Sequence, residues 1–205
     1  MLQPLIGKLN DIRVVLASSS KQREQLLKSI NLKFEIIPSD FEENLNPSEH
    51  TFSDFVENTA RGKTSNVYEK LKNETPKPGM IIGVDTMVTF DGKMYGKPKN
   101  NEDAIRIIKD LTQSGLPNDV YTGVAIWYNN KIHTFTEVTT VYMAKLSNEE
   151  IESYVSTGEP FGKAGGYGIQ GIAGTFVERI EGDVNNVVGL PLCRLAKELK
   201  KIMAV

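Results

Sequence analysis

The feature that most constrains this chain is the stretch from Gly158 to Gly174, which holds seven of the 17 glycines within 17 residues. Glycine loses more backbone entropy on folding than any other residue, so this density indicates positive φ angles or a close approach of backbone to another group. Flexible linkers are rich in Gly and Ser, whereas this stretch also contains Ile, Phe and Tyr. Because Glu159, Lys163, Tyr167 and Gln170 lie among the glycines, we favour a site for a polar, phosphorylated small molecule over a linker.

Two nucleotide-binding motifs nearly match this stretch and fail in their context. Residues 166–171 fit G-x-G-x-x-G, but that motif needs a strand before it and a helix after it. Here a turn-rich segment precedes the glycines, and residues 174–180 alternate like a strand. Residues 158–163 resemble a P-loop, yet the glycine spacing is short and Ala164 stands where Ser or Thr is needed.

The bulk composition is that of an ordinary globular protein. The chain has 205 residues, 40% hydrophobic and 24% charged, with a net charge of −2, and we expect one domain over residues 1–205 that buries a substantial core. A nucleic-acid partner is not expected, because there is no basic excess to neutralise many phosphates. No apolar run approaches the length of a membrane span.

The compartment is predicted from two further features. Residues 1–11 carry Lys8 and Asp11 and no long apolar run, so no signal peptide is expected. Cys193 is the single cysteine, which excludes an intramolecular disulfide and suits a reducing compartment. We therefore expect a cytoplasmic protein, with Cys193 as a buried thiol in a C-terminal helix.

Hydrophobic periodicity predicts a mixture of strands and helices. The expected strands are residues 12–17, 33–37, 80–86, 119–128, 132–144 and 175–180, and the expected helices are residues 52–71, 101–113, 147–156, 191–203 and a short one after Ser20. The two kinds of element do not alternate strictly, which favours an α/β domain built on a large mixed sheet.

One candidate site lies where the first strand meets the first of these helices. Ser18, Ser19 and Ser20 follow the strand, and Arg23 lies one helical turn on. Ser19 and Gln22 have the spacing of a capping box. Helix N-terminal N–H groups and a bidentate arginine together favour an anion. Capping alone would account for one serine but not for three serines and Arg23.

Carboxylates mark two further candidate positions. Asp40, Glu42 and Glu43 form a short acidic run, which is either solvated surface or a source of oxygen ligands for a hard cation. Asp85 ends an apolar strand, and an aspartate there caps a turn or serves chemistry, because a buried unpaired charge is costly.

Six ordered motifs together resemble one family. They are residues 15–23, 83–86, 96–98, 121–124, 158–171, and 182–183 with 186–191. In this order they are similar to the Maf family of nucleoside triphosphate pyrophosphatases, from about residue 13 to 200. The resemblance implies a two-lobed fold related to inosine triphosphatases, with a large mixed twisted sheet, flanking helices and a cleft between the lobes.

The resemblance also implies an activity and its cofactor. It implies hydrolysis of a nucleoside triphosphate to the monophosphate and pyrophosphate, with Mg²⁺ or Mn²⁺. It points to the branch acting on dTTP and UTP, or on modified pyrimidine nucleotides, which would clear non-standard nucleotides. We expect a small-molecule substrate, neither nucleic acid nor membrane as partner, and a homodimer. A nucleotide-binding regulator without turnover is the alternative.

Site residues follow from the resemblance position by position. Asp85 matches the catalytic aspartate, and the phosphate- and metal-site positions are Ser18, Arg23, Glu43, Lys63 and Lys97. We assign Lys63 and Lys97 to catalysis with Asp85, and Glu43 to the metal with Asp85. Thr86 and Gln170 match the positions that mark the dTTP/UTP branch, and Lys163 is added to the substrate-binding set.

One position departs from the family pattern. Residues 20–23 read Ser-Lys-Gln-Arg where the family has Ser-Pro-Arg-Arg, so Gln22 replaces an arginine at a specificity position. This substitution bears on base preference more than on catalysis, and Gln22 either reads the base or faces solvent. Asp85 either orients or deprotonates the attacking water or ligates the metal, and the sequence leaves both roles open.

Overall fold

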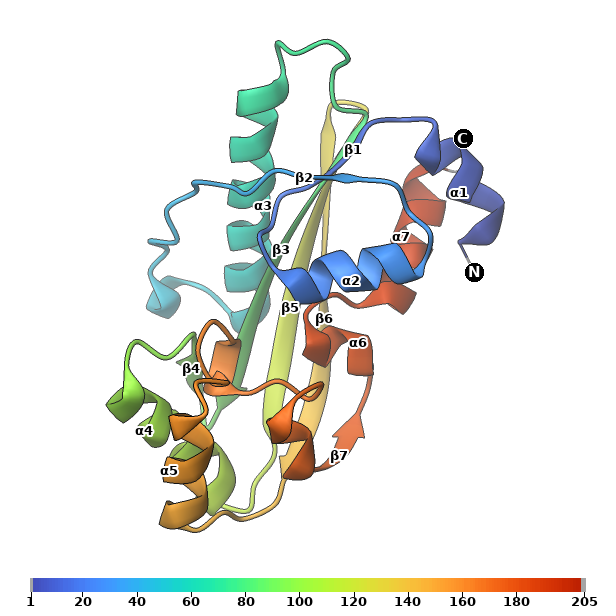
Figure 1. The fold of residues 1–205 in the computed structure, drawn as a ribbon. Helices are drawn as coiled ribbons and strands as arrows, with labels where there is room; N and C mark the ends of the chain where they lie inside the picture. Colours follow the sequence, from blue (N-terminus) through green and yellow to red (C-terminus); the bar gives the residue numbers. More distant parts are fainter. Residues whose placement is uncertain (1, 204–205) are drawn as a thin grey trace. The chain divides into compact units, whose positions relative to one another are not determined.

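The computed structural model describes residues 2–203, in which seven strands form one mixed sheet (Figure 1). Its order is β2-β1-β3-β5-β6-β7, and β4 pairs with β3 outside this path. β1 is parallel to β2 and β3, whereas β4 and β7 are antiparallel to their neighbours. The strands are β1 (Val14–Leu16), β2 (Glu35–Ile36), β3 (Met80–Phe90), β4 (Lys93–Tyr95), β5 (Asn118–Tyr128), β6 (Lys131–Met143) and β7 (Val177–Glu181).

Helices and short 3₁₀ turns connect the strands. They are α1 (Gln3–Asn10), α2 (Lys21–Ser29), η1 (Pro47–Glu49), α3 (Phe52–Leu71), α4 (Asn101–Gln113), α5 (Asn148–Ser156), η2 (Ala164–Gly166), η3 (Ile172–Thr175), α6 (Val184–Val188) and α7 (Leu192–Met203).

The chain forms two compact units. Unit 1 contains the residues up to Asp85, Thr122–Glu137 and the residues from Gly189 onward. Unit 2 contains Thr86–Tyr121 and Val138–Val188. The strands β3, β5 and β6 each contribute residues to both units.

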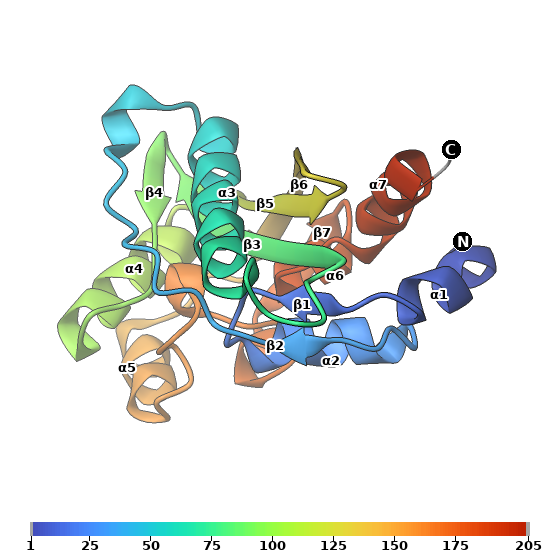
Figure 2. The same cartoon turned by 90° about the horizontal axis from the view of Figure 1, so that it is seen from above.

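In unit 1, α3 covers one face of the β1 and β3 residues. Val15, Ala17 and Ile81 pack there against Val67 and Leu71 of α3. Side chains alternate across a strand, so the neighbours of these residues point to the opposite face, where α2 lies (Figure 2). β1 is buried on both faces as a result, which explains its uninterrupted apolar sequence.

In unit 2, the core joins α4 and α5 to the glycine-rich stretch. α4 contributes Ile108 and Leu111, and α5 contributes Ile151; the two helices lie side by side (Figures 1 and 2). Tyr167 and Phe176, which flank the second half of the stretch, are buried in the same core. The stretch is therefore a folded part of unit 2, and a flexible linker is excluded.

The mixed α/β fold predicted from the sequence is confirmed, and several elements match closely. The helices at residues 52–71 and 101–113 have the predicted bounds, and the capping box of Ser147 and Glu150 is formed. None of the helices within residues 2–203 is both long and apolar enough to cross a membrane.

Other predictions are wrong in detail. The N-cap of α2 is Ser20 and not Ser19: Ser20 has extended φ and ψ angles, and its side chain accepts a hydrogen bond from the Arg23 N–H. The strand expected from residue 175 begins at Val177, because η3 occupies the residues before it. Cys193 is exposed rather than buried. The short helices α1 and α6 were not predicted: α6 has only five residues, and Leu9 is the one buried residue among the eight of α1, so neither shows an apolar period.

Candidate active site

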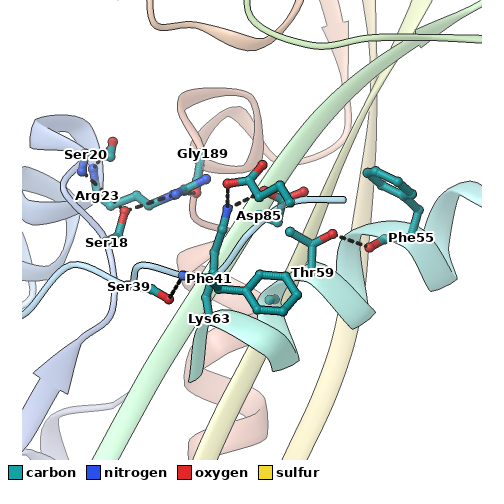
Figure 3. Close-up of polar contacts among 12 residues, drawn as sticks. Ser18, Ser20, Arg23, Ser39, Phe41, Phe55, Thr59, Lys63, Asp85 and Gly189 are labelled. Atoms are coloured by element: carbon teal, nitrogen blue, oxygen red, sulfur yellow. Dashed lines mark hydrogen bonds and ion pairs between the residues drawn. The ribbon is translucent and has the colours of Figure 1, made fainter. Parts of the chain in front are cut away.

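A buried aspartate and a lysine form the centre of the candidate site in unit 1. Asp85 lies in β3 directly after five buried residues, and its Oδ1 accepts a hydrogen bond from Lys63 Nζ at 2.7 Å (Figure 3). The same ammonium lies 2.7 Å from Glu43 Oε1. One lysine thus forms ion pairs with two carboxylates that come from different segments.

The three charged groups differ in their exposure to solvent. The side chains of Asp85 and Lys63 are 8% and 14% exposed, whereas that of Glu43 is 52% exposed. Burial raises the pKa of Asp85 above its usual range, and the nearby Glu43 carboxylate raises it further; the Lys63 ammonium and Arg23 oppose this shift. Asp85 is therefore a better proton acceptor than an ordinary surface aspartate.

A glycine in β3 allows Lys63 to reach Asp85. A Cβ atom at Gly83 would lie 2.2 Å from Thr64 Oγ1 and 2.6 Å from the Ala60 carbonyl oxygen. No side chain fits at this position, so the backbone of β3 lies directly against α3. This close approach brings Lys63 of α3 next to Asp85 of β3.

A second group of polar contacts lies at the junction of β1 and α2. Arg23 Nη1 donates to Ser18 Oγ at 3.1 Å, and Arg23 Nε donates to the Gly189 carbonyl oxygen at 2.9 Å (Figure 3). Burial lowers the pKa of the Arg23 guanidinium, and the carboxylates of Asp85 and Glu43 oppose this effect. Arg23 therefore lies within electrostatic reach of the Lys63 cluster and remains charged at neutral pH.

Gln22 lies on the first turn of α2, next to this junction. Its side-chain Oε1 accepts a hydrogen bond from Ser20 Oγ at 3.2 Å, and the side chain is partly buried. The local hydrogen bond uses the oxygen of the amide and leaves its NH₂ group to donate elsewhere.

The remaining predicted residues belong to unit 2. Thr86 follows Asp85 in β3 and is partly buried, whereas Lys97 and Gln170 are exposed. Lys163 Nζ donates to the Glu159 carbonyl oxygen. The structure thus assembles Ser18, Arg23, Glu43, Lys63 and Asp85 within unit 1.

Within unit 2, the glycine-rich stretch is tied to the segment that carries Lys97. Gly165 has a φ of 68°, in the region that favours glycine, and its N–H donates to the Gly96 carbonyl oxygen at 3.0 Å. A backbone hydrogen bond therefore joins the glycine-rich stretch to Gly96, the residue before Lys97.

Glu159 joins the two ends of the glycine-rich stretch through hydrogen bonds, a role that the sequence did not reveal. Its carboxylate accepts hydrogen bonds from the N–H groups of Ile172 (2.8 Å) and Ala173 (3.0 Å). Tyr154 Oη donates to the Gly166 carbonyl oxygen at 3.1 Å. These two side chains add to the backbone hydrogen bonds from the Gly171 N–H to the Gly168 carbonyl and from the Gly174 N–H to the Gly171 carbonyl.

The donor set suits a divalent cation held jointly by protein and substrate. Residues 2–203 contain no group of three or more His, Cys, Asp or Glu side chains that could bind a metal ion, but Glu43 and Asp85 converge on one positive charge. Mg²⁺ is commonly held by one or two carboxylates together with substrate phosphates and water. The two carboxylates fit that pattern.

Comparisons with known proteins give the family of the chain. The model of the family described as Maf-like protein matches residues 13–202. A dTTP/UTP pyrophosphatase of Clostridium novyi is 46% identical over 91% of this chain and 95% of the relative. One of Alkaliphilus metalliredigens is 44% identical over 92% and 95%. Among solved structures, a Staphylococcus aureus Ham1 protein aligns with 14% identity and a TM-score of 0.46, covering 64% of this chain and 72% of that chain. Because the family model spans nearly the whole chain, the chain belongs to the family of Maf-like proteins.

Proposed function

We propose that this protein hydrolyses dTTP or UTP to the nucleoside monophosphate and pyrophosphate. The observation that carries the proposal is the Lys63 ammonium bridging Glu43 and Asp85, with Arg23 held by Ser18 nearby in the same unit. The substrate pair comes from relatives above 40% identity that are named dTTP/UTP pyrophosphatase.

The charge balance of the unit 1 cluster supports a cation-dependent reaction. Arg23 and Lys63 carry two positive charges, and Glu43 and Asp85 carry two negative charges, so these four groups cancel. A triphosphate brings several further negative charges, which need additional positive charge for attack to proceed. A divalent cation at Glu43 and Asp85 would supply it by neutralising phosphate oxygens. Lys97 and Lys163 of unit 2 remain candidates for catalysis and for substrate binding, respectively.

The residues of the chain have distinct roles in this mechanism. Water attacks the α-phosphorus, and the bond from this phosphorus to the oxygen that bridges it to the β-phosphate breaks. Asp85 orients the attacking water and accepts its proton. Arg23 and Ser18 bind a phosphate oxygen at the N-terminus of α2. Lys63 stabilises charge that develops as pyrophosphate leaves.

The test is a substrate panel of dTTP, UTP, CTP and ATP with Mg²⁺ or Mn²⁺, in which pyrophosphate release is measured. We expect release from dTTP and UTP at rates well above those from ATP, and no release with excess chelator. Tight binding of dTTP without pyrophosphate would overturn the proposal in favour of a nucleotide-binding regulator. Release of orthophosphate instead would place the attack at the wrong phosphorus.

A further inference from the structure

Glu43 forms an ion pair with Lys63 although it lies outside any helix or strand. Glu43 lies in an irregular segment between β2 and α3, and its side chain is about half exposed. An ion pair of such an exposed group contributes little by itself. The short distance from Glu43 Oε1 to Lys63 Nζ therefore needs other contacts that fix the segment.

Part of that support is a set of hydrogen bonds to Asn66 of α3. Asn66 Oδ1 accepts from Ser39 Oγ at 3.0 Å and from the Asp40 N–H at 3.1 Å. Ser39 Oγ in turn accepts from the Phe41 N–H at 3.0 Å (Figure 3). These bonds fix the backbone of residues 39–41 along the helix.

A second support lies one turn further along α3. Lys70 Nζ donates to the Pro38 carbonyl oxygen at 3.2 Å and lies 2.6 Å from Asp40 Oδ2. Lys63, Asn66 and Lys70 are three and four residues apart and hence lie on one face of the helix. The segment therefore runs along this face from residue 38 to residue 43.

The third contact is the closest, and it involves a glycine inside α3. A Cβ atom at Gly62 would lie 2.3, 2.5 and 2.7 Å from the Cζ, Cε2 and Cε1 atoms of the Phe41 ring. The ring therefore lies on the bare backbone of the helix (Figure 3), and no other residue fits at position 62 with the ring in place. Glycine weakens a helix relative to alanine, so its presence in α3 is explained by the ring.

We infer that Phe41 and Gly62 form a docking pair that positions Glu43 beside Lys63. Phe41 is two residues before Glu43, and Gly62, on which the Phe41 ring lies, is directly before Lys63. One contact therefore fixes the backbone beside both partners of the ion pair. Neither Phe41 nor Gly62 bears a group that takes part in the chemistry, and both are positioning residues. The inference rests on the proposed function only where it concerns the cation and turnover.

The test compares two glycine-to-alanine variants in helices of unit 1. Gly62→Ala introduces a methyl group against the ring, whereas Gly7→Ala in α1 introduces one where no atom lies within 4 Å. We expect backbone amide exchange of residues 39–43 to be about tenfold faster in Gly62→Ala than in wild type, and unchanged in Gly7→Ala. Equal exchange in the two variants would overturn the inference.

A second measurement, the affinity for Mn²⁺, tests the position of the Glu43 carboxylate. Mn²⁺ alone is titrated against each protein and followed by electron paramagnetic resonance. We expect the Kd for Mn²⁺ to rise about tenfold in Gly62→Ala, the lower end of what supporting partners of metal-site ligands contribute. Adding Phe41→Leu to Gly62→Ala removes the ring atoms that clash, and should restore much of the affinity and of the slow exchange. A double variant no better than Gly62→Ala would contradict the inference.

The docking pair can be tested even where Gly62→Ala fails to fold or the proposed function is wrong. Phe41→Ala removes the ring without a clash, and it should give the same fast exchange in residues 39–43 with the rest of unit 1 unchanged. If wild type neither binds Mn²⁺ nor releases pyrophosphate, the proposed function fails. The exchange comparison then still decides whether Phe41 and Gly62 fix the segment.

Discussion

The charged cluster of unit 1 and the glycine-rich stretch of unit 2 are held in place by different means. In the cluster, side chains hold one another: Lys63 bonds Asp85 and Glu43, and Arg23 bonds Ser18. In the stretch, the backbone carries most of the contacts, and one side chain, Glu159, binds two N–H groups. A change in the cluster therefore alters charge at the reaction centre, whereas a change in the stretch alters the shape of a loop.

This difference predicts the largest loss of activity at Asp85. Asp85→Asn should lower kcat by about two to four decades, the range typical of a general acid–base group. The fold should persist, because asparagine has almost the same volume and removes a carboxylate whose burial disfavours the charge. Steady-state kinetics with dTTP, together with thermal unfolding, measures both effects.

The matched control is Asp91→Asn, in the exposed turn between β3 and β4. Asp91 has a φ of 48°, a conformation that asparagine also tolerates, so activity and stability should stay at the wild-type level. Near-normal turnover by Asp85→Asn would remove this residue from the chemistry.

The two lysines proposed for catalysis provide a sharper comparison of the units. Lys63→Ala leaves Asp85 buried without its ammonium partner, so it should cost about 3 kcal/mol of unfolding free energy as well as activity. Lys97 is exposed, and Lys97→Ala should lower kcat/KM while changing the unfolding free energy by less than about 0.5 kcal/mol. Urea denaturation and kinetics on both variants measure the difference.

Lys93→Ala, at the exposed first residue of β4, is the control for removing a surface lysine. If Lys97→Ala has the kinetics of Lys93→Ala, Lys97 is a surface residue and the positive charge for the triphosphate comes from elsewhere. Equal losses of stability for Lys63→Ala and Lys97→Ala would contradict the contrast between the units.

The contacts of Glu159 test the other half of the comparison. Glu159→Ala leaves the N–H groups of Ile172 and Ala173 without their acceptor, which should cost roughly 1–3 kcal/mol of unfolding free energy. Glu178→Ala on β7, where the side chain is exposed, should cost little. The glycine-rich stretch would not depend on Glu159 if the two variants unfolded at the same urea concentration.

Much of the fold could be predicted from the sequence because its long elements bury one face. The period of α4 and the turn residues between β5 and β6 mark those elements clearly, and Asp85 stands out as a charge at the end of an apolar run. The links that complete the cluster could not be predicted. Phe41 on Gly62 and Arg23 on the Gly189 carbonyl join residues far apart in the chain, and no local pattern encodes such a contact.

The smallest predicted effect concerns Gln22, where the chain departs from the pattern that it resembles. Gln22 Oε1 already accepts from Ser20 Oγ, so the amide can offer a substrate its NH₂ group and one remaining lone pair, but no charge. An arginine there would add a charged, bidentate donor beside Arg23. Gln22→Arg should therefore change the ratio of kcat/KM values between bases by about 1 kcal/mol, or roughly fivefold, the lower end of the range for one specific base contact.

The panel for this variant is dTTP, UTP, CTP and 7-methyl-GTP, with Gln25→Arg on the exposed side of α2 as control. Both variants add one positive charge to the same helix, so a general electrostatic effect on the triphosphate should raise or lower all substrates together in both. Only a residue near the base changes the ratios. If the ratios in Gln22→Arg equal those in Gln25→Arg, Gln22 faces solvent, and discrimination between bases must come from Thr86 and Gln170 in unit 2.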